Sequence, residues 1–225
     1  MTKRCAFLIC ALLAAVAVSA TFASTSFFGP TGLIVMPTAE ILGQGQVQLY
    51  ANYLERDDYH ETPYGVNLGL GQGMELGIST IDETGDNDGT KTIVNAKYAL
   101  SSNNMTGGSM AVGAINAADH SGFRGTIITA DDGEVCPYIV MSKKTAFGPV
   151  SLPLTLHVGY IGGMIDGTML GASADLTPNV TLMADWVDNF SDLSYGISFN
   201  ASNGLSIKAA AVDGDFTAGL TFSVR

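Results

Sequence analysis

The sequence predicts an all-β fold: a closed, antiparallel, up-and-down transmembrane β-barrel of about twelve strands, within a range of roughly 10–14. The first observation is residues 192–225, which alternate between apolar and small or polar side chains. A period of two places these two kinds of residue on opposite faces of a strand. The second is composition, since 27 of 225 residues are glycine and only 14% are charged. The third is an alternation of short and long connections, as in outer-membrane barrels.

Residues 1–23 have the pattern of a secretory signal peptide. Met1-Thr2-Lys3-Arg4 is a basic start, an apolar stretch follows over residues 6–20, and Thr21-Phe22-Ala23 supplies small residues before a cleavage site. The apolar stretch is shorter than the roughly 20 residues of a helical span. We therefore expect cleavage after Ala23, secretion, and location in a bacterial outer membrane. The loss of Cys5 and Cys10 leaves Cys136 alone, so the mature chain has no intrachain disulfide.

Residues 24–45, called the leader below, do not alternate. Their motif consists of Gly29, Pro30, Thr31, Gly32, Pro37 and Thr38. The proline and glycine residues prevent a regular helix. We expect the leader to lie across or inside the periplasmic mouth of the barrel and to narrow it; a mobile leader is the alternative.

The barrel is expected over residues 46–225. Strand candidates lie at 47–54, 64–70, 74–79, 92–100, 108–117, 134–141, 154–161, 164–176, 180–186, 193–201, 205–211 and 216–224. The middle is less regular, and residues 126–129 form either a hairpin within a long loop or an extra strand. The connections at 71–73, 177–179 and 202–204 are short, whereas those at 55–63, 82–90 and 118–133 are long. This difference and the even strand count place both termini in the periplasm.

The two faces of the predicted strands differ in chemistry. Large apolar and aromatic side chains occupy one face, and glycine, serine, threonine and asparagine the other. In a membrane barrel the first face meets lipid and the second lines a wet lumen. Five charged or titratable side chains fall on the inward face, namely Glu75, Lys97, His157, Asp185 and Lys208. Glu75 and Lys97 lie on neighbouring strands and are expected to form a structural ion pair.

No catalytic, metal or cofactor site is predicted. A hydrolase in a membrane barrel would need a serine or threonine nucleophile, a histidine base and an orienting acid. Thr155, His157 and Asp185 all face inward, but no motif joins them. The acidic stretch over residues 82–89 lacks the ligand spacing of an EF-hand. The chain is therefore not expected to be an enzyme.

The run from Phe28 to Glu40, with its "GPTGLI…PTA" pattern, resembles the start of YjbH-like outer-membrane proteins. The likeness covers roughly 30 residues together with the strand that follows. It implies a β-barrel and a link to exopolysaccharide production.

The expected function is that of a passive pore, or of a structural or export component for surface polysaccharide. A soluble periplasmic β-sandwich or barrel that serves as a binding module is the alternative, and an outer-membrane hydrolase is a third reading. Expected partners are outer-membrane lipids, the barrel assembly machinery and polysaccharide export proteins. The net charge of −11 disfavours nucleic acid as a partner.

Overall fold

The computed structural model describes residues 24–56, 59–85, 89–105, 108–117, 135–147, 152–163, 165–189, 191–201 and 203–225, with backbone only at 101–105 and 146–147. The predicted signal peptide and the hairpin considered at 126–129 lie outside these residues. Every regular element in the described part of the chain is a strand. The same residues contain no helix with the length and apolar character needed to cross a membrane.

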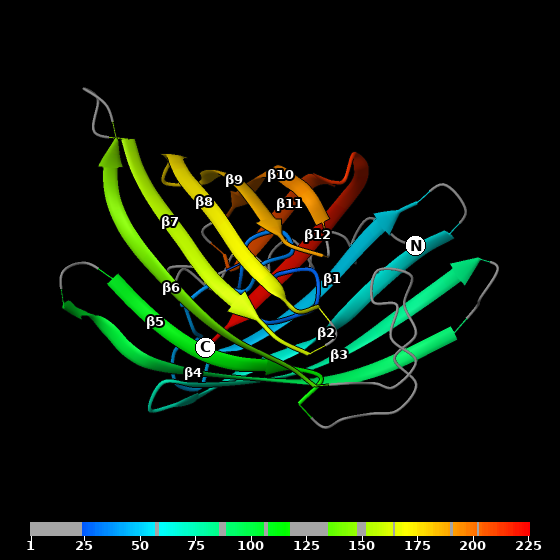
Figure 1. The fold of residues 1–225 in the computed structure, drawn as a ribbon, viewed down its shortest axis with the longest axis horizontal. Helices are drawn as coiled ribbons and strands as arrows, with labels where there is room; N and C mark the ends of the chain where they lie inside the picture. Colours follow the sequence, from blue (N-terminus) through cyan, green and yellow to red (C-terminus); the bar gives the residue numbers. More distant parts are fainter. Residues whose placement is uncertain are drawn as a thin grey trace, which may run out of the picture.

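Twelve strands form one closed antiparallel barrel, which confirms the predicted fold (Figure 1). They are β1 (Val47–Glu55), β2 (Tyr59–Gly71), β3 (Met74–Gly85), β4 (Gly89–Met105), β5 (Gly108–Ile115), β6 (Cys136–Phe147), β7 (Leu152–Ile161), β8 (Gly167–Thr177), β9 (Val180–Val187), β10 (Ser191–Asn200), β11 (Leu205–Val212) and β12 (Asp215–Val224). Each strand pairs with its neighbours in sequence, and β1 pairs with β12 to close the cylinder.

Tight turns fix the register of the hairpins at both ends of the barrel. Asp213 and Gly214 join β11 to β12, and both have positive φ, at 55° and 95°. Gln72 and Gly73, between β2 and β3, likewise have φ of 52° and 80°. Two successive residues with positive φ produce a turn whose twist matches that of the flanking strands.

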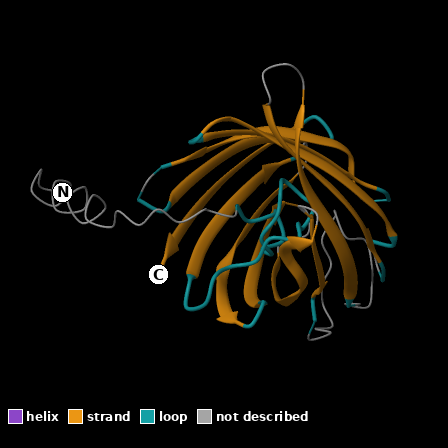
Figure 2. Cartoon of the chain, turned by 90° about the vertical axis from the view of Figure 1, so that its left-hand side faces the viewer, coloured by secondary structure: helices purple, strands orange, loops and turns teal. Residues whose placement is uncertain are grey.

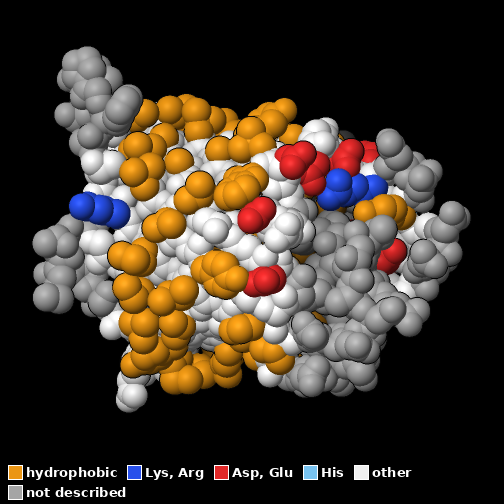
Figure 3. Space-filling view, viewed as in Figure 1, with side chains coloured by type: hydrophobic (Ala, Val, Ile, Leu, Met, Phe, Trp, Pro, Cys, Tyr) orange, Lys and Arg blue, Asp and Glu red, His pale blue; other side chains and the backbone are white. Residues whose placement is uncertain are grey.

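The outer face of the barrel is apolar, as the alternation predicted. On β3 the exposed residues include Leu76 and Ile78, and the inward residues between them are buried. Tyr98, Tyr160, Phe199 and Phe216 are also exposed on outward faces. The space-filling view shows apolar side chains across the visible wall and only a few charged ones, most of them toward one edge (Figure 3).

The leader lies inside the cylinder. It runs as loops and turns surrounded by the strands, and both ribbon views place it between the walls (Figures 1 and 2). Every residue from Thr25 to Ala39 is buried. The inward side chains of the wall are therefore buried against the leader, and the outward side chains of the wall are exposed.

Candidate functional site

The leader folds back on itself through short backbone contacts. Isolated bridges join Thr25 to Thr31 and Gly32 to Pro37. The Gly32–Pro37 bridge closes the base of a small loop over residues 33–36, in which the Leu33 N–H donates to the Met36 carbonyl at 2.9 Å. The motif residues therefore shape the turns, as their proline and glycine content suggested, and the walls supply most of the remaining partners.

The Glu75–Lys97 centre lies on β3 and β4 and contacts both ends of the leader motif. The Glu75 carboxylate accepts hydrogen bonds from the N–H groups of Thr31 and Leu42, each at 3.0 Å. Lys97 Nζ donates to the carbonyls of Thr31 and Thr38, at 2.7 and 3.2 Å. Lys97 and Glu75 are 3.9 Å apart and both are buried. The two charges therefore form the expected ion pair and bind the leader backbone as well.

A set of polar side chains beside this centre binds leader carbonyls. Asn67 Nδ2 donates to the Gly29 carbonyl at 2.6 Å, and Asn95 Nδ2 donates to the Phe28 carbonyl at 2.8 Å. The Ser79 hydroxyl donates to the same Phe28 carbonyl at 2.9 Å. The conformation of Gly29 leaves no room for a side chain, since a Cβ there would collide with Ser79 and with the Tyr50 hydroxyl.

The Asp185–Lys208 centre lies across the lumen, on β9 and β11. Asp185 Oδ2 accepts hydrogen bonds from three successive N–H groups of the leader, those of Ile34, Val35 and Met36, at 2.9 to 3.0 Å. Lys208 Nζ donates to the carbonyls of Thr25 and Leu33. Successive amides that converge on one oxygen form an anion-binding concavity, and here the barrel wall provides the anion.

His157 binds the leader only indirectly. Its Nδ1 is hydrogen-bonded to Ser142 Oγ at 2.8 Å, and Ser142 Oγ accepts the Ala39 N–H at 3.0 Å. The Nε2 atom is 3.5 Å from Ser173 Oγ. Asp185 is engaged by the leader instead of orienting this imidazole, so the structure does not bring Thr155, His157 and Asp185 together as a triad.

The structure thus places all five inward candidates against the leader or beside its contacts. Sequence reasoning did not single out the neutral partners, which are Tyr50, Asn52, Asn67, Ser79, Asn95 and Ser142. Their inward position follows from the alternation alone. A polar residue at an inward position, especially an asparagine, was the available signal, because a buried amide requires partners.

The far part of the lumen is largely apolar, which corrects the expectation of a wet interior throughout, although Glu61 and Glu83 are buried at the same level on β2 and β3. Leu54, Ile81, Ile93, Ile161 and Val212 are all buried inside the barrel near the strand ends opposite the leader's entry. They belong to one hydrophobic cluster with Phe27, Phe28 and the 33–36 loop of the leader. Part of the interior therefore resembles the core of a soluble protein, because leader side chains fill space that water would otherwise occupy.

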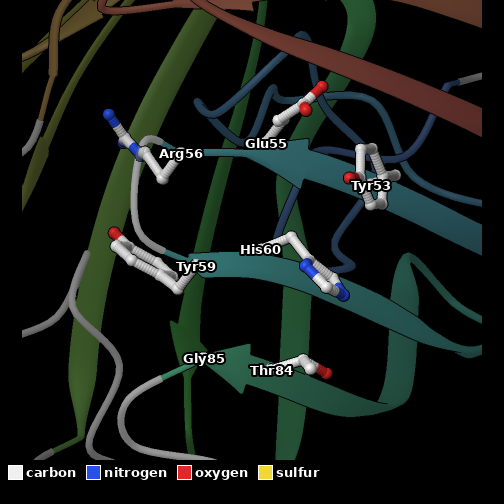
Figure 4. A pocket seen from close by; sticks show the side chains of 7 residues that line it. All are labelled: Tyr53, Glu55, Arg56, Tyr59, His60, Thr84 and Gly85. Atoms are coloured by element: carbon white, nitrogen blue, oxygen red, sulfur yellow. The ribbon is translucent and has the colours of Figure 1, made fainter.

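A pocket of about 330 Å³ lies at the rim formed by the ends of β1, β2 and β3 (Figure 4). Tyr53 and His60 line it, and their ring centroids are 5.7 Å apart. Arg56 also lines the pocket, and it forms ion pairs with Asp215 at 2.6 Å and with Asp213 at 3.8 Å. No cluster of three or more metal-ligating side chains occurs in the part of the chain that the structure describes.

Comparison with known proteins supports the fold. A solved structure described as KdgM porin superposes with a TM-score of 0.50 at 12% identity, over 79% of this chain and 98% of that chain. KdgM porin in complex with disordered oligogalacturonate gives 0.48 and 10%, over 79% and 98%. The N-terminal β-barrel domain of Pseudomonas aeruginosa OprF gives 0.29 and 14%, over 81% and 100%. No protein family matches the sequence, and no curated protein does.

Proposed function

We propose that this chain is a porin-like protein of the outer membrane whose channel is closed at rest by its own leader. The proposal depends on one observation: the charged side chains of the lumen bind the leader. Glu75, Lys97, Asp185 and Lys208 are buried on facing walls, and each binds the backbone of the leader. A lumen with these groups is polar enough to conduct once the leader moves aside.

The outer face favours a membrane over water. Leu49, Ile78, Val158, Tyr195 and Leu220 are all about half exposed and lie on β1, β3, β7, β10 and β12, so exposed apolar residues occur around the cylinder. Such a continuous apolar surface is rare on soluble monomers. Closure of the sheet also leaves no strand edge, which is the condition for a β-structure to cross a bilayer. The alternative of a soluble periplasmic binding module does not account for this surface.

The number of hydrogen bonds between the wall and the leader indicates that the leader is bound stably in the lumen. Its removal would take from Glu75, Lys97, Asp185 and Lys208 the leader N–H and carbonyl groups that they bind, and a hydrogen bond to a charged group contributes about 1.5–3 kcal/mol. The contacts are directed at backbone groups, so they fix the position of the leader as well as its presence. We therefore propose that the closed form is the resting state and that opening requires a change in the leader contacts.

The first experiment tests the membrane assignment. The full chain is expressed in a Gram-negative host, fractionated, and run on SDS gels with and without boiling. We expect it in the outer-membrane fraction, with a faster-migrating unboiled band because a closed barrel resists SDS. Recovery in the soluble fraction, with identical mobility before and after boiling, would refute the assignment.

The second experiment tests closure by the leader. Leu33 Cδ1 lies 2.6 Å from the position of a Cβ at Gly171, so a Leu33→Cys/Gly171→Cys variant in a Cys136→Ala background is placed to form a disulfide between the 33–36 loop and the wall. In planar bilayers we expect the oxidised variant to remain closed and reduction to restore openings. The single Leu33→Cys variant is the control, and its conductance should not respond to reductant.

A variant that lacks residues 25–42 completes this test. We expect it to conduct continuously, provided that it still shows the mobility shift of a folded barrel. A folded but non-conducting deletion variant would refute the channel while leaving the membrane assignment intact.

We also propose, on the resemblance of the leader run to YjbH-like proteins, that the channel acts in the export of surface polysaccharide. The segment with this resemblance is the one that occupies the lumen. Deletion of the gene in its source bacterium should lower exopolysaccharide yield, and the disulfide-locked variant should fail to restore it. If the locked variant restored the exopolysaccharide yield, polysaccharide export would not depend on opening of the channel, and this proposal would be refuted.

A further inference from the structure

The two sides of the lumen bind the leader to different extents. On the wall formed by β1–β4, Asn52, Asn67, Ser79 and Asn95 each donate a hydrogen bond to a leader carbonyl. The Glu75–Lys97 centre adds its contacts to the same wall. The β1–β4 wall therefore forms hydrogen bonds with leader residues 26–31 and 38–42 along most of their length.

The opposite wall, formed by β9–β12, carries buried hydroxyls that the leader does not use. The side chains of Ser191, Ser194 and Ser206 are buried, and none of their hydroxyls has a hydrogen-bond partner among the described residues. The second carboxylate oxygen of Asp185, Oδ1, also lacks one. We call Asp185, Ser191, Ser194 and Ser206 the serine strip. Buried polar groups in native proteins nearly always have partners, so a run of such groups points to an occupant from solution.

The strip is continuous with the lumenal charges and is lined by small residues. Ser194 is the register partner of Asp185, and Ser206 lies two residues before Lys208 on β11. Gly196 follows Ser194 at the next inward position, and Gly219 lies beside Lys208 on β12. The glycines leave space only locally, because the register partners of Gly196 and Ser194 are the buried Met183 and Val212.

The leader meets this wall mainly through one loop. Residues 33–36 bind Asp185 through three N–H groups, and Leu33 and Met36 lie against Gly171 of β8. The Gly32–Pro37 bridge closes the base of the loop. Lys208 Nζ also donates to the Leu33 carbonyl, and the Phe27 N–H donates to the Ile34 carbonyl at 2.7 Å, so the loop leaves the wall only when these bonds break as well. The 33–36 loop is therefore the part of the leader that is held mainly from the β8–β11 side, whereas residues 26–31 and 38–42 are held by β1–β4.

We infer that the serine strip is the path of solutes through this barrel, opened when the 33–36 loop leaves Asp185, and that it takes small uncharged solutes rich in hydroxyl groups. This inference rests on the proposed channel and names its path and substrate class. Hydroxyl groups of a passing solute satisfy the serine hydroxyls and Asp185 in turn. One acid and one lysine lie along the path, so the wall has no net charge that would favour ions of one sign.

The experiment compares the two walls in the full-length protein. Single cysteines replace Ser194 or Ser206 on the strip, or Ser79 on the opposite wall, in a Cys136→Ala background. Each carries Asp185→Asn to weaken the hold on the loop, and the gel mobility shift confirms a folded barrel. The probe is a charged, membrane-impermeant methanethiosulfonate reagent applied in proteoliposomes. We expect the two strip positions to react at least about tenfold faster than position 79, which corresponds to an opening that is ~1.4 kcal/mol easier.

The second measurement is liposome swelling in arabinose. We expect Asp185→Asn to accelerate swelling, Ser194→Leu in the same background to suppress it, and Ser109→Leu to leave it accelerated, because Ser109 lies on β5 and its hydroxyl bonds the Ser142 carbonyl and not the leader. Equal or faster labelling at position 79, or swelling that survives Ser194→Leu, would overturn the path while leaving the channel intact. The absence of both conductance and swelling in every variant, including the deletion of residues 25–42, would instead overturn the proposed function and the path with it.

Discussion

The β1–β4 and β9–β12 walls of this barrel have similar inward compositions but opposite relations to the leader. On β1–β4 the asparagine, serine and lysine side chains are matched to leader carbonyls. On β9–β12 only Asp185, Lys208 and Thr221 reach the leader, while Ser191, Ser194 and Ser206 have no partner among the described residues. Polar residues of the same type thus bind the leader on the β1–β4 wall, whereas on the β9–β12 wall several of them do not contact it through hydrogen bonds.

This difference teaches that polarity of the lumenal face does not by itself indicate a water-filled channel. Both walls carry unsatisfied atoms, since Asn67 Oδ1 and Asn95 Oδ1 on β1–β4 also lack a partner among the described residues. The walls differ in whether the side chain binds the leader at all: the two asparagines donate to it through Nδ2, whereas the hydroxyls of Ser191, Ser194 and Ser206 have no partner among the described residues. An unsatisfied buried group costs about 1–3 kcal/mol. The predictions below test whether equal chemical changes on the two walls have unequal effects.

The largest effect is expected from Glu75→Gln. The change removes the counter-charge of Lys97 while both remain buried, and it weakens acceptance from Thr31 and Leu42. We expect a loss of about 3–5 kcal/mol in the free energy of unfolding. Urea unfolding in lipid vesicles, followed by tryptophan fluorescence, measures it. Glu55→Gln, on the exposed outer end of β1, should lie within about 0.5 kcal/mol of the parent, and equal effects of both changes would contradict the role of the centre.

The next effect is expected from Gly29→Ala. This position has φ of 112°, and its added Cβ would collide with Ser79, Tyr50 and Asn95. We expect a cost of about 1–3 kcal/mol and faster digestion of the leader by protease in folded barrels. Gly43→Ala is the matched change in the same segment, because the nearest atom to a Cβ there is 3.5 Å away. A leader that stays resistant in both variants would show that the wall does not hold it closely at Gly29.

A smaller but sharper contrast is expected between Ser79→Ala and Ser194→Ala. The first removes a hydroxyl that donates to the Phe28 carbonyl, and the second removes a hydroxyl with no partner among the described residues. We expect a loss of about 1–2 kcal/mol for the first. The second should be neutral or slightly stabilising, within about 0.5 kcal/mol. Similar losses from both would remove the distinction between the walls.

The smallest effect is expected at the rim. Arg56→Ala breaks the ion pairs with Asp213 and Asp215, which are partly exposed. We expect about 0–1 kcal/mol, and less in 1 M salt, because exposed pairs are screened. A large loss that persists in high salt would mean that the rim supports the β1–β12 contact more than its exposure implies.

Alternation was enough to predict the fold. Residues 192–225 predicted three strands with the correct faces, and the structure pairs them as β10, β11 and β12. The strands were predicted too short where loops begin: β3 was expected to end at Ser79 but continues to Gly85. That extension carries Ile81 into the lumen, which is one reason why the apolar part of the interior was missed.

The partners of the inward side chains could not be predicted in the same way. Asp185 binds residues about 150 positions earlier in the chain, and no periodicity encodes such a contact. The leader motif indicated turns through Gly29, Pro30 and Pro37, but its side chains carry little information about the wall. The wall recognises carbonyl and N–H groups, which every residue has, so the sequence identified the binding groups without identifying what they bind.

The seam between β1 and β12 has a consequence for the order of events in biogenesis. Val47 pairs with Val224, so the cylinder cannot be completed until β12 has been made. The leader precedes β1 directly and ends up enclosed. A curved, still open sheet therefore has to close around the leader, and the loss of chain entropy is concentrated in that final closing step. The leader would then act as an internal template whose absence slows closure, a kinetic cost separate from any change in the finished barrel.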